Sequence, residues 1–298
     1  MRVTLLHNPK AGREEYSGKS LTAALRDKGH KVTYRSTKKR KWKAAIDQRD
    51  DLVVAAGGDG RVGKVARQLI GRGTPLSVLP LGTANNLART LGFDQPVKKL
   101  IARIGKGTPR GFDVGLARGP WGRRYLFEGV GAGLLAEYLR LPKKKEQEEL
   151  SKEEEMRQHV ARLRKLLSKH RARKWELEID GEKLTDRSLL FEAMNICSVG
   201  PVLKLAPGAK TNDGQFDLVL AREAERETLM DYLAARLAWE KEPDLPLPSR
   251  SFKRLRIGWK KSPLHLDDEL WPNDDQKRPK PGEIEIAVRP SALMVLRP

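Results

Sequence analysis

A glycine-rich turn directly after an apolar run is the first part of this sequence whose residue types could do chemistry. Residues 52–70 read LVVAAGGDGRVGKVARQLI and fit three phosphate-binding patterns. The spacing G-x-G-x-x-G from Gly58 to Gly63 matches a dinucleotide fingerprint, and the same span followed by Lys64 matches most of a Walker A loop. The third pattern is GGDG at 57–60, where a carboxylate stands among the glycines. The three patterns imply different ligands, so the surrounding residues decide between them.

The first two patterns each lack a residue that their chemistry needs. Dinucleotide sites carry an acidic residue about 20 positions after the glycines to bind the ribose, but residues 61–93 contain no Asp or Glu. A Walker A loop needs a hydroxyl for magnesium after its lysine, and Val65 stands there. The third pattern accounts for Asp59, because a cation can bridge a carboxylate to phosphates held by backbone N–H groups. The sequence favours this third pattern over the alternative that the glycines only permit a tight turn.

Two further polar turns follow other apolar runs. HNPKAGR at 7–13 follows the first run, and PLGTANNLARTLG at 80–92 follows the fourth. In an open parallel sheet, loops at the carboxyl ends of strands meet at one edge, where ligands bind. We expect Thr83 to cap the following helix and expose its first N–H groups. The three loops together predict a phosphate site.

The elements that position these loops alternate along the first hundred residues. Strand patterns at 3–7, 31–36, 51–56 and 75–82 alternate with helix patterns at 17–30, 42–46, 64–73 and from 83 onward. This rhythm predicts an α/β domain with an open parallel sheet and flanking helices. After about residue 111, strand patterns separated by Asp-Gly turns predict a C-terminal antiparallel β-sandwich-like domain with a charged helical insertion. The predicted boundaries are 1–112 for a nucleotide-binding domain and 113–289 for a β-rich acceptor domain, with the tail 290–298 packing back on the first.

Charge and composition restrict the partners. The 298 residues carry a net charge of +20, which attracts polyanions such as anionic lipid headgroups and nucleotide phosphates, although a bias in composition alone remains an alternative. No motif with interleaved basic and aromatic residues occurs, so nucleic acid is not expected. The single cysteine, Cys197, excludes an intrachain disulfide and fits a cytoplasmic protein. No apolar stretch approaches the roughly 18 residues of a spanning helix.

The segment 143–174 is highly charged and predicts a helix. Ser151 and Glu154 form a capping-box pattern, and apolar residues follow at helical spacing: Met156, Val160, Leu163 and Leu167. Two interpretations stay open. The helix is either solvated, or it lies with its basic side chains on the anionic inner face of a membrane.

Five ordered motifs resemble a known family. HNPKAG, GGDG, PLGTANNLAR, APGAKTNDGQFDLVL and LHLDDE occur here in the order found in the diacylglycerol kinase catalytic-domain superfamily, which includes bacterial lipid kinases and sphingosine and ceramide kinases. The resemblance extends from Val3 to the closing SALMVLRP. It implies an ATP- and Mg²⁺-dependent lipid kinase, with ATP in a cleft and the hydroxyl of a lipid such as diacylglycerol approaching from the second domain.

The same resemblance assigns the site residues. It implies nucleotide contacts at Asn8, Lys10, Gly57, Gly58, Asp59, Gly60, Arg61, Gly82, Thr83, Asn85 and Asn86. It implies magnesium-associated carboxylates at Asp113, Asp213 and Asp217. Asp267 matches the Asp of the family's Asp-Gly-Glu motif, the proposed general base, and Glu269 matches its Glu.

Several residues depart from the family pattern. Arg61 stands where Thr is usual, Asn86 where many members have Asp, and Asp268 where the motif has Gly; Gly63-Lys64 replaces Asn-Glu. A catalytically degenerate protein that binds nucleotide or anionic lipid is therefore one alternative. A kinase of NAD, whose family shares the GGDG loop, is another. The sequence identifies neither the lipid acceptor nor the oligomeric state.

Overall fold

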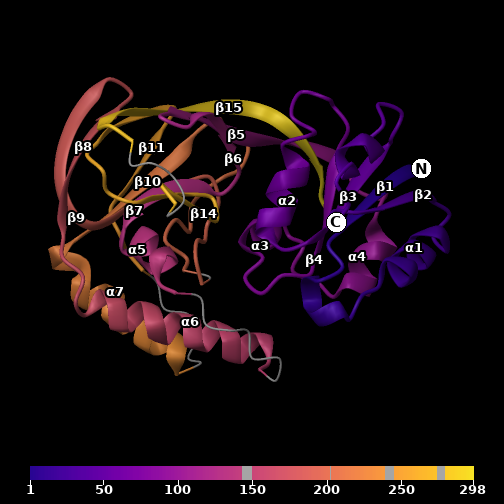
Figure 1. The fold of residues 1–298 in the computed structure, drawn as a ribbon, viewed down its shortest axis with the longest axis horizontal. Coiled ribbons are helices and arrows are strands. Elements are labelled where there is room, and N and C mark those ends of the chain that lie inside the picture. Colours follow the sequence, from indigo (N-terminus) through magenta and orange to yellow (C-terminus); the bar gives the residue numbers. More distant parts are fainter. Residues whose placement is uncertain (143–149, 202, 239–244, 274–278) are drawn as a thin grey trace. The chain divides into compact units, whose positions relative to one another are not determined.

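The protein folds as two compact units (Figure 1). The computed structural model describes residues 1–142, 150–201, 203–238, 245–273 and 279–298. Unit 1 comprises Met1–Asp113 and Pro290–Pro298, and unit 2 comprises Val114–Arg289. Strands β5 (Pro109–Gly119) and β15 (Gly282–Leu296) each contribute residues to both units.

Unit 1 is built on a parallel sheet in the order β4-β3-β1-β2, and the end of β15 joins β4 through Val295 and Leu76. The strands are β1 (Arg2–His7), β2 (Lys31–Ser36), β3 (Leu52–Gly57) and β4 (Leu76–Pro80). Every residue of β3 is buried, as its unbroken apolar run predicts for a central parallel strand. The sheet therefore supplies a rigid edge for the loops that follow β1, β3 and β4.

Helices follow the strands of unit 1 along the chain. They are α1 (Gly18–Arg26), α2 (Asp59–Ala66), α3 (Asn86–Thr90) and α4 (Val97–Arg103), with 3₁₀ turns η1 (Ala11–Glu14) and η2 (Trp42–Ala45). Ser17 caps α1 by accepting from Ser20 N at 3.0 Å. The prediction of a helix at 64–73 was wrong in its bounds, because Gly58 serves as the N-cap and α2 begins directly at Asp59.

Unit 2 is an antiparallel β structure. Its strands pair in the order β14-β13-β7-β9-β8-β12-β15, while β10 pairs with β9 and β11, and β6 pairs with β5. The further strands are β6 (Gly122–Leu126), β7 (Gly129–Gly133), β8 (Arg173–Ile179), β9 (Glu182–Met194), β10 (Phe216–Arg222), β11 (Ser249–Phe252), β12 (Arg254–Trp259), β13 (Leu264–Leu266) and β14 (Glu269–Trp271). The predicted fold class, an α/β domain followed by an antiparallel sandwich-like domain, is confirmed.

The described residues of unit 2 also form three helices and a 3₁₀ turn. These are α5 (Leu134–Arg140), α6 (Lys152–Leu167), α7 (Arg226–Leu237) and η3 (Glu223–Glu225). Helices α6 and α7 lie side by side, and α6 also packs on α5 (Figure 1). A core of buried Leu and Val side chains from these helices covers one face of β9 and β10. Aromatic residues such as Trp175, Phe191 and Phe216 fill a second core.

Helix α6 confirms that the charged segment 143–174 contains a helix. Ser151 and Glu154 form the predicted capping box, and Val160, Leu163 and Leu167 are buried, while Met156 is half-buried. Residues 143–149 of that segment lie outside the described residues. Within the described ranges, no helix is long and apolar enough to cross a membrane.

Candidate functional site

The loops after β1, β3 and β4 are joined directly to one another in unit 1. Asn8 N donates to Ala56 O at 3.0 Å, and Leu81 N donates to Gly57 O at 3.0 Å. The parallel register places His7 beside Ala56 and Gly57 beside Pro80. The three predicted loops therefore meet at the carboxyl edge of the sheet, as expected for a ligand site in an open parallel sheet.

Two glycines bring the backbones of two loops into contact. A Cβ added to Gly82 would lie 2.6 Å from Gly58 Cα, and a Cβ added to Gly58 would lie 3.2 Å from Gly82 Cα. Real Cβ atoms essentially never show the first distance, and the second is tighter than nine in ten real Cβ contacts. Position 82 therefore requires glycine for the close approach of the two chains, and a side chain at position 58 would require a small shift of Gly82.

Asp59 connects the same two loops through its side chain. Its carboxylate accepts hydrogen bonds from Asn86 N at 2.9 Å and Leu87 N at 3.2 Å, the first N–H groups of α3. A negative charge at this end of a helix is stabilised by the exposed amides and the helix dipole. Asp59 therefore connects its own loop to the start of α3, and a cation that bridges its carboxylate to phosphates stays a prediction.

The prediction that Thr83 caps α3 was wrong. Asn85 is the N-cap, in the left-handed region with φ 51°. Its side chain turns back on Gly82, accepting from Gly82 N at 2.9 Å and donating to Gly82 O at 2.7 Å. Asn tolerates the left-handed region better than most residues, and here it closes the loop. Thr83 is exposed.

Helix α2 directs its N-terminus toward this loop cluster, and Arg61 lies in its first turn. Arg61 packs over Gly57, because a Cβ added to Gly57 would lie 3.0 Å from Arg61 Cβ and 3.7 Å from Asn8 Cβ. Arg61 Nε and Asn8 Oδ1 are buried and have no hydrogen-bond partner among the described residues. A buried polar atom without a partner is costly and is expected where a ligand completes the site. Lys10, the other predicted contact in the first loop, is exposed.

These features fit the phosphates of a nucleotide. A helix N-terminus and a glycine turn offer backbone N–H groups to phosphate oxygens. A guanidinium adds a planar, permanently charged donor group. Of the predicted nucleotide contacts, Gly57, Gly58, Asp59, Gly60 and Arg61 are contiguous, and Gly82, Asn85 and Asn86 lie in the facing loop.

Asp267 occupies the turn between β13 and β14 in unit 2. Leu266 pairs with Glu269, so Asp267 and Asp268 form a two-residue turn, and Asp267 has φ 51°. Its Oδ1 accepts from the backbone N–H groups of Phe127 at 3.0 Å, Glu128 at 2.9 Å and Gly129 at 3.1 Å. Three amide donors hold this carboxylate in one orientation.

Glu269 lies one strand position beyond the turn and is half-exposed. Its Oε2 lies 3.3 Å from Arg124 Nη1. The Arg124 guanidinium also lies 5.9 Å from the centre of the Trp121 ring, a cation–π arrangement. Arg124 therefore holds Glu269 beside the turn. The residues next to Arg124 and Glu269 in the sequence give no signal for this contact.

Each of the three predicted magnesium-associated carboxylates accepts a hydrogen bond within its own unit. Asp113 is fully buried in unit 1 and accepts from Ser291 N at 2.8 Å. In unit 2, Asp213 accepts from Gln215 N at 3.0 Å within its own turn, and Asp217 accepts from Ser251 Oγ at 2.9 Å. Over the described residues, no group of three or more His, Cys, Asp or Glu side chains could hold a metal ion. Mg²⁺ is usually held by one or two carboxylates together with water and phosphate oxygens, so the association of these three carboxylates with magnesium stays a prediction.

A buried ionisable pair lies beside the Asp267 turn and was missed in the sequence. His265 Nε2 lies 2.7 Å from Glu192 Oε2, and the two side chains are 2% and 1% exposed. Burial raises the pKa of Glu192. Burial alone would lower the pKa of His265, but the adjacent Glu192 carboxyl outweighs it and the pKa is raised. The signal that could have found the pair is a glutamate inside the apolar strand LLFEAM.

Comparisons with known proteins agree with this architecture. Residues 2–117 match the family model of the diacylglycerol kinase catalytic domain, and residues 143–237 match that of the YegS C-terminal NAD kinase beta sandwich-like domain. A diacylglycerol kinase of Bacillus subtilis (strain 168) is 28% identical over 282 residues, which cover 90% of this chain and 89% of that protein. One of Mycobacterium tuberculosis (strain ATCC 25618 / H37Rv) is 28% identical over 267 residues, covering 86% and 79%. The crystal structure of a diacylglycerol kinase from Bacillus anthracis str. Sterne superposes with a TM-score of 0.73 at 19% identity, covering 100% of this chain and 97% of the other.

Proposed function

Since this chain belongs to the superfamily of bacterial diacylglycerol kinase-like lipid kinases, we propose that it transfers the γ-phosphoryl group of ATP to the hydroxyl of a lipid such as diacylglycerol. The family as a whole supports a phosphotransferase that acts on an alcohol acceptor. The observation that carries the proposal is the loop cluster of unit 1. There, Gly58 and Gly82 are in backbone contact beneath a helix N-terminus, and a buried guanidinium nitrogen of Arg61 lacks a partner among the described residues.

The residues of this cluster would bind and orient the triphosphate. Phosphoryl transfer depends mainly on positioning and charge neutralisation. The amides at the start of α2 and the Arg61 guanidinium supply positive charge without further rearrangement. A divalent metal, which the kinase family usually uses with ATP, would neutralise further phosphate charge when bound.

Asp267 is the proposed base for the acceptor hydroxyl. The three amides that hold its Oδ1 fix the carboxylate before substrate arrives. A fixed carboxylate can orient a lipid hydroxyl and accept its proton. Glu269, held by Arg124, is the second proposed carboxylate.

A matched set of variants tests this assignment. Radiolabel transfer from ATP to diacylglycerol in mixed micelles is compared for Asp267→Asn, Glu269→Gln and Asp268→Asn. Removal of a general base lowers kcat by about 10²–10⁴-fold, so Asp267→Asn is expected to lose that much. Asp268 is the exposed neighbour in the same turn, so Asp268→Asn controls for charge and is expected to retain activity. Unchanged kcat in correctly folded Asp267→Asn would exclude Asp267 as the general base.

A second candidate function is nucleotide binding without turnover. One observation favours it: the Asp59 carboxylate, which was expected to meet a cation, accepts hydrogen bonds from the first two amides of α3. Calorimetry with ATP, combined with a phosphorylation assay on total lipid extract and on NAD, distinguishes the functions. ATP binding without any phosphorylated lipid supports the non-catalytic protein, and phosphorylated NAD supports the kinase of NAD.

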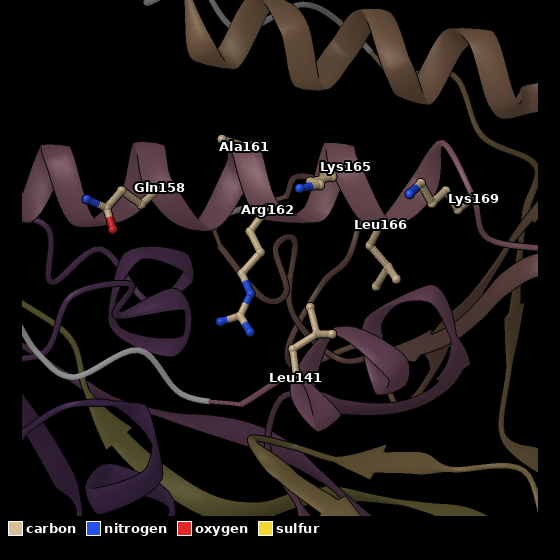
Figure 2. Close-up of a pocket in the computed structure, with 7 residues that line it drawn as sticks. All are labelled: Leu141, Gln158, Ala161, Arg162, Lys165, Leu166 and Lys169. Atoms are coloured by element: carbon tan, nitrogen blue, oxygen red, sulfur yellow. The ribbon is translucent and has the colours of Figure 1, made fainter.

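We also propose that unit 2 associates with an anionic phospholipid surface through α6. A pocket of about 550 Å³ lies along this helix (Figure 2). Leu141 and Leu166 supply apolar side chains to it, and Arg162, Lys165 and Lys169 supply cationic groups. Apolar contacts flanked by positive charges complement acyl chains beneath anionic headgroups.

Liposome co-sedimentation tests this surface. Binding is expected to require anionic lipid and to weaken as salt is added, because the electrostatic attraction is screened over about 10 Å at 0.1 M salt. Reversing the charge of Lys165 and Lys169 together is expected to abolish binding. Reversing Lys183 and Lys253, which are exposed and do not line the pocket, makes the same change in net charge as a control. Equal binding by the two double variants, or salt-independent binding, would contradict the proposal.

A further inference from the structure

The side chains of Glu192 and His265 meet across a strand that has a glycine between them. In the sheet, Gly131 of β7 pairs with His265 of β13 on one side and with Glu192 of β9 on the other. A Cβ at Gly131 would lie 2.0 Å from Glu192 Oε2. The glutamate can therefore cross β7 only because position 131 has no side chain.

The His265 ring connects Glu192 to the turn that contains Asp267. His265 Nε2 lies 2.7 Å from Glu192 Oε2, and His265 Nδ1 lies 3.0 Å from the backbone carbonyl oxygen of Asp267. A carbonyl oxygen only accepts, so Nδ1 carries the proton and donates. The carboxyl of Glu192 fixes the plane of the ring, in the way that carboxylates orient histidines in other sites.

The strand segment that binds the Asp267 carboxylate is fixed from its other side. Asn195, fully buried, donates through Nδ2 to Phe127 O at 3.0 Å and through its backbone N to Glu128 O at 2.8 Å. Asp267 N donates to Gly129 O at 2.8 Å. The amides of 127–129 are thus aligned by the backbone of the Asp267 turn and by Asn195 together.

We infer that Glu192 and His265 are positioning residues, which hold the turn at Asp267 so that its carboxylate stays on the amides of 127–129. The inference rests on the proposed function, in which Asp267 is the base. The contact through which both residues act on the turn is the hydrogen bond from His265 to the Asp267 carbonyl oxygen. Burying an ionisable pair costs free energy unless both groups are hydrogen-bonded. The location of this pair beside the Asp267 turn indicates that it serves to hold the turn.

Two substitutions of His265 separate its two contacts. In His265→Asn, the side-chain N–H₂ replaces Nδ1–H and keeps the donor to Asp267 O. In His265→Gln, the longer amide replaces Nε2 and keeps the contact with Glu192, but loses that donor. Glu192→Gln retains a polar partner for the ring, and Glu192→Leu does not. The matched control is Asp186→Asn, which alters another buried carboxylate of β9 whose partner is Arg222.

Two readouts are taken on the intact protein. Amide hydrogen exchange of residues 127–129 reports whether the Asp267 turn is held. Steady-state kinetics with ATP and diacylglycerol reports kcat and KM separately. Displacing a catalytic group by about 1 Å costs roughly 10²-fold in rate, so we expect His265→Gln and Glu192→Leu to lower kcat by about that factor. KM for ATP is expected to stay unchanged, and exchange at 127–129 to become faster.

The conservative variants decide between positioning and general stability. His265→Asn and Glu192→Gln are expected to restore slow exchange and most of kcat, while Asp186→Asn affects neither. Unchanged exchange at 127–129 in His265→Gln, or equal acceleration in Asp186→Asn, overturns the inference. Faster exchange with unchanged kcat overturns the role of Asp267 as base and with it the catalytic part of the inference. If the wild type phosphorylates no lipid, the proposed function fails, and the exchange experiment alone decides whether the pair holds the turn.

Discussion

Replacing Asp59 with alanine is expected to destabilise unit 1 by about 3 kcal/mol. The carboxylate accepts from Asn86 N at 2.9 Å and Leu87 N at 3.2 Å. Both donors belong to buried residues, and the N-cap Asn85 makes no side-chain capping bond. A hydrogen bond to a charged group contributes about 1.5–3 kcal/mol, so the low end for two bonds gives about 3 kcal/mol. Asp59→Asn keeps one acceptor oxygen without the charge, and we expect it to lose about half as much.

The assay is urea unfolding followed by circular dichroism, with ATP binding measured by calorimetry. Asp94→Ala is the control, because it makes the same charge change at an exposed position of unit 1. Asp59→Ala should also weaken ATP binding, since the GGDG loop loses its tie to α3. Free energies of unfolding for Asp59→Ala and Asp94→Ala that agree within about 0.5 kcal/mol would refute the reasoning, because a lost cap alone costs about that or more.

Three further predictions follow from contacts elsewhere in the chain. Gly82→Ala is expected to cost about 1–3 kcal/mol of stability by overpacking the facing loop, and to weaken ATP binding. The control is Gly208→Ala, because nothing lies within 4 Å of the added Cβ, and it should change neither quantity. Stability is measured by urea unfolding and ATP binding by calorimetry. The folded protein raises the pKa of Glu192 above its ordinary 4.5 and that of His265 above its ordinary 6.5, so it retains protons that the unfolded chain releases as pH rises through these two values. The stability contributed by the pair is therefore complete below pH 4.5 and falls as pH rises, by up to about 1.4 kcal/mol per pH unit for each retained proton. Urea unfolding at several pH values should show this fall, and His265→Gln should remove the part that begins near pH 6.5. Ser151→Ala should destabilise the start of α6 by about 1 kcal/mol, because it removes the capping box. Amide exchange in the first turn of α6 should then become faster. An unchanged exchange rate would contradict the capping role of Ser151.

Much of the fold could be predicted because its signals are local. Alternating apolar strands and helices, the Ser17 cap of α1 and the capping box of α6 each depend on residues within a few positions of one another. Backbone geometry at that scale follows from side-chain shape and hydrogen bonding along the chain. The loops at 7–13, 57–60 and 80–92 were predicted to share one edge because parallel strands place their carboxyl ends together. The boundaries of α2 were missed, since the glycines that end β3 also begin the helix.

The amino-acid sequence by itself determined which residue types stand in the loops and in which order. Only the tertiary structure decided what those residues contact. Asp59 binds amides 27 and 28 positions away, and Asp267 binds amides 138 to 140 positions away. Glu192 reaches His265 because the sheet register aligns both with Gly131. Register and loop packing are set by the burial of whole strands, so a motif can show that a carboxylate is present while its partner depends on the fold.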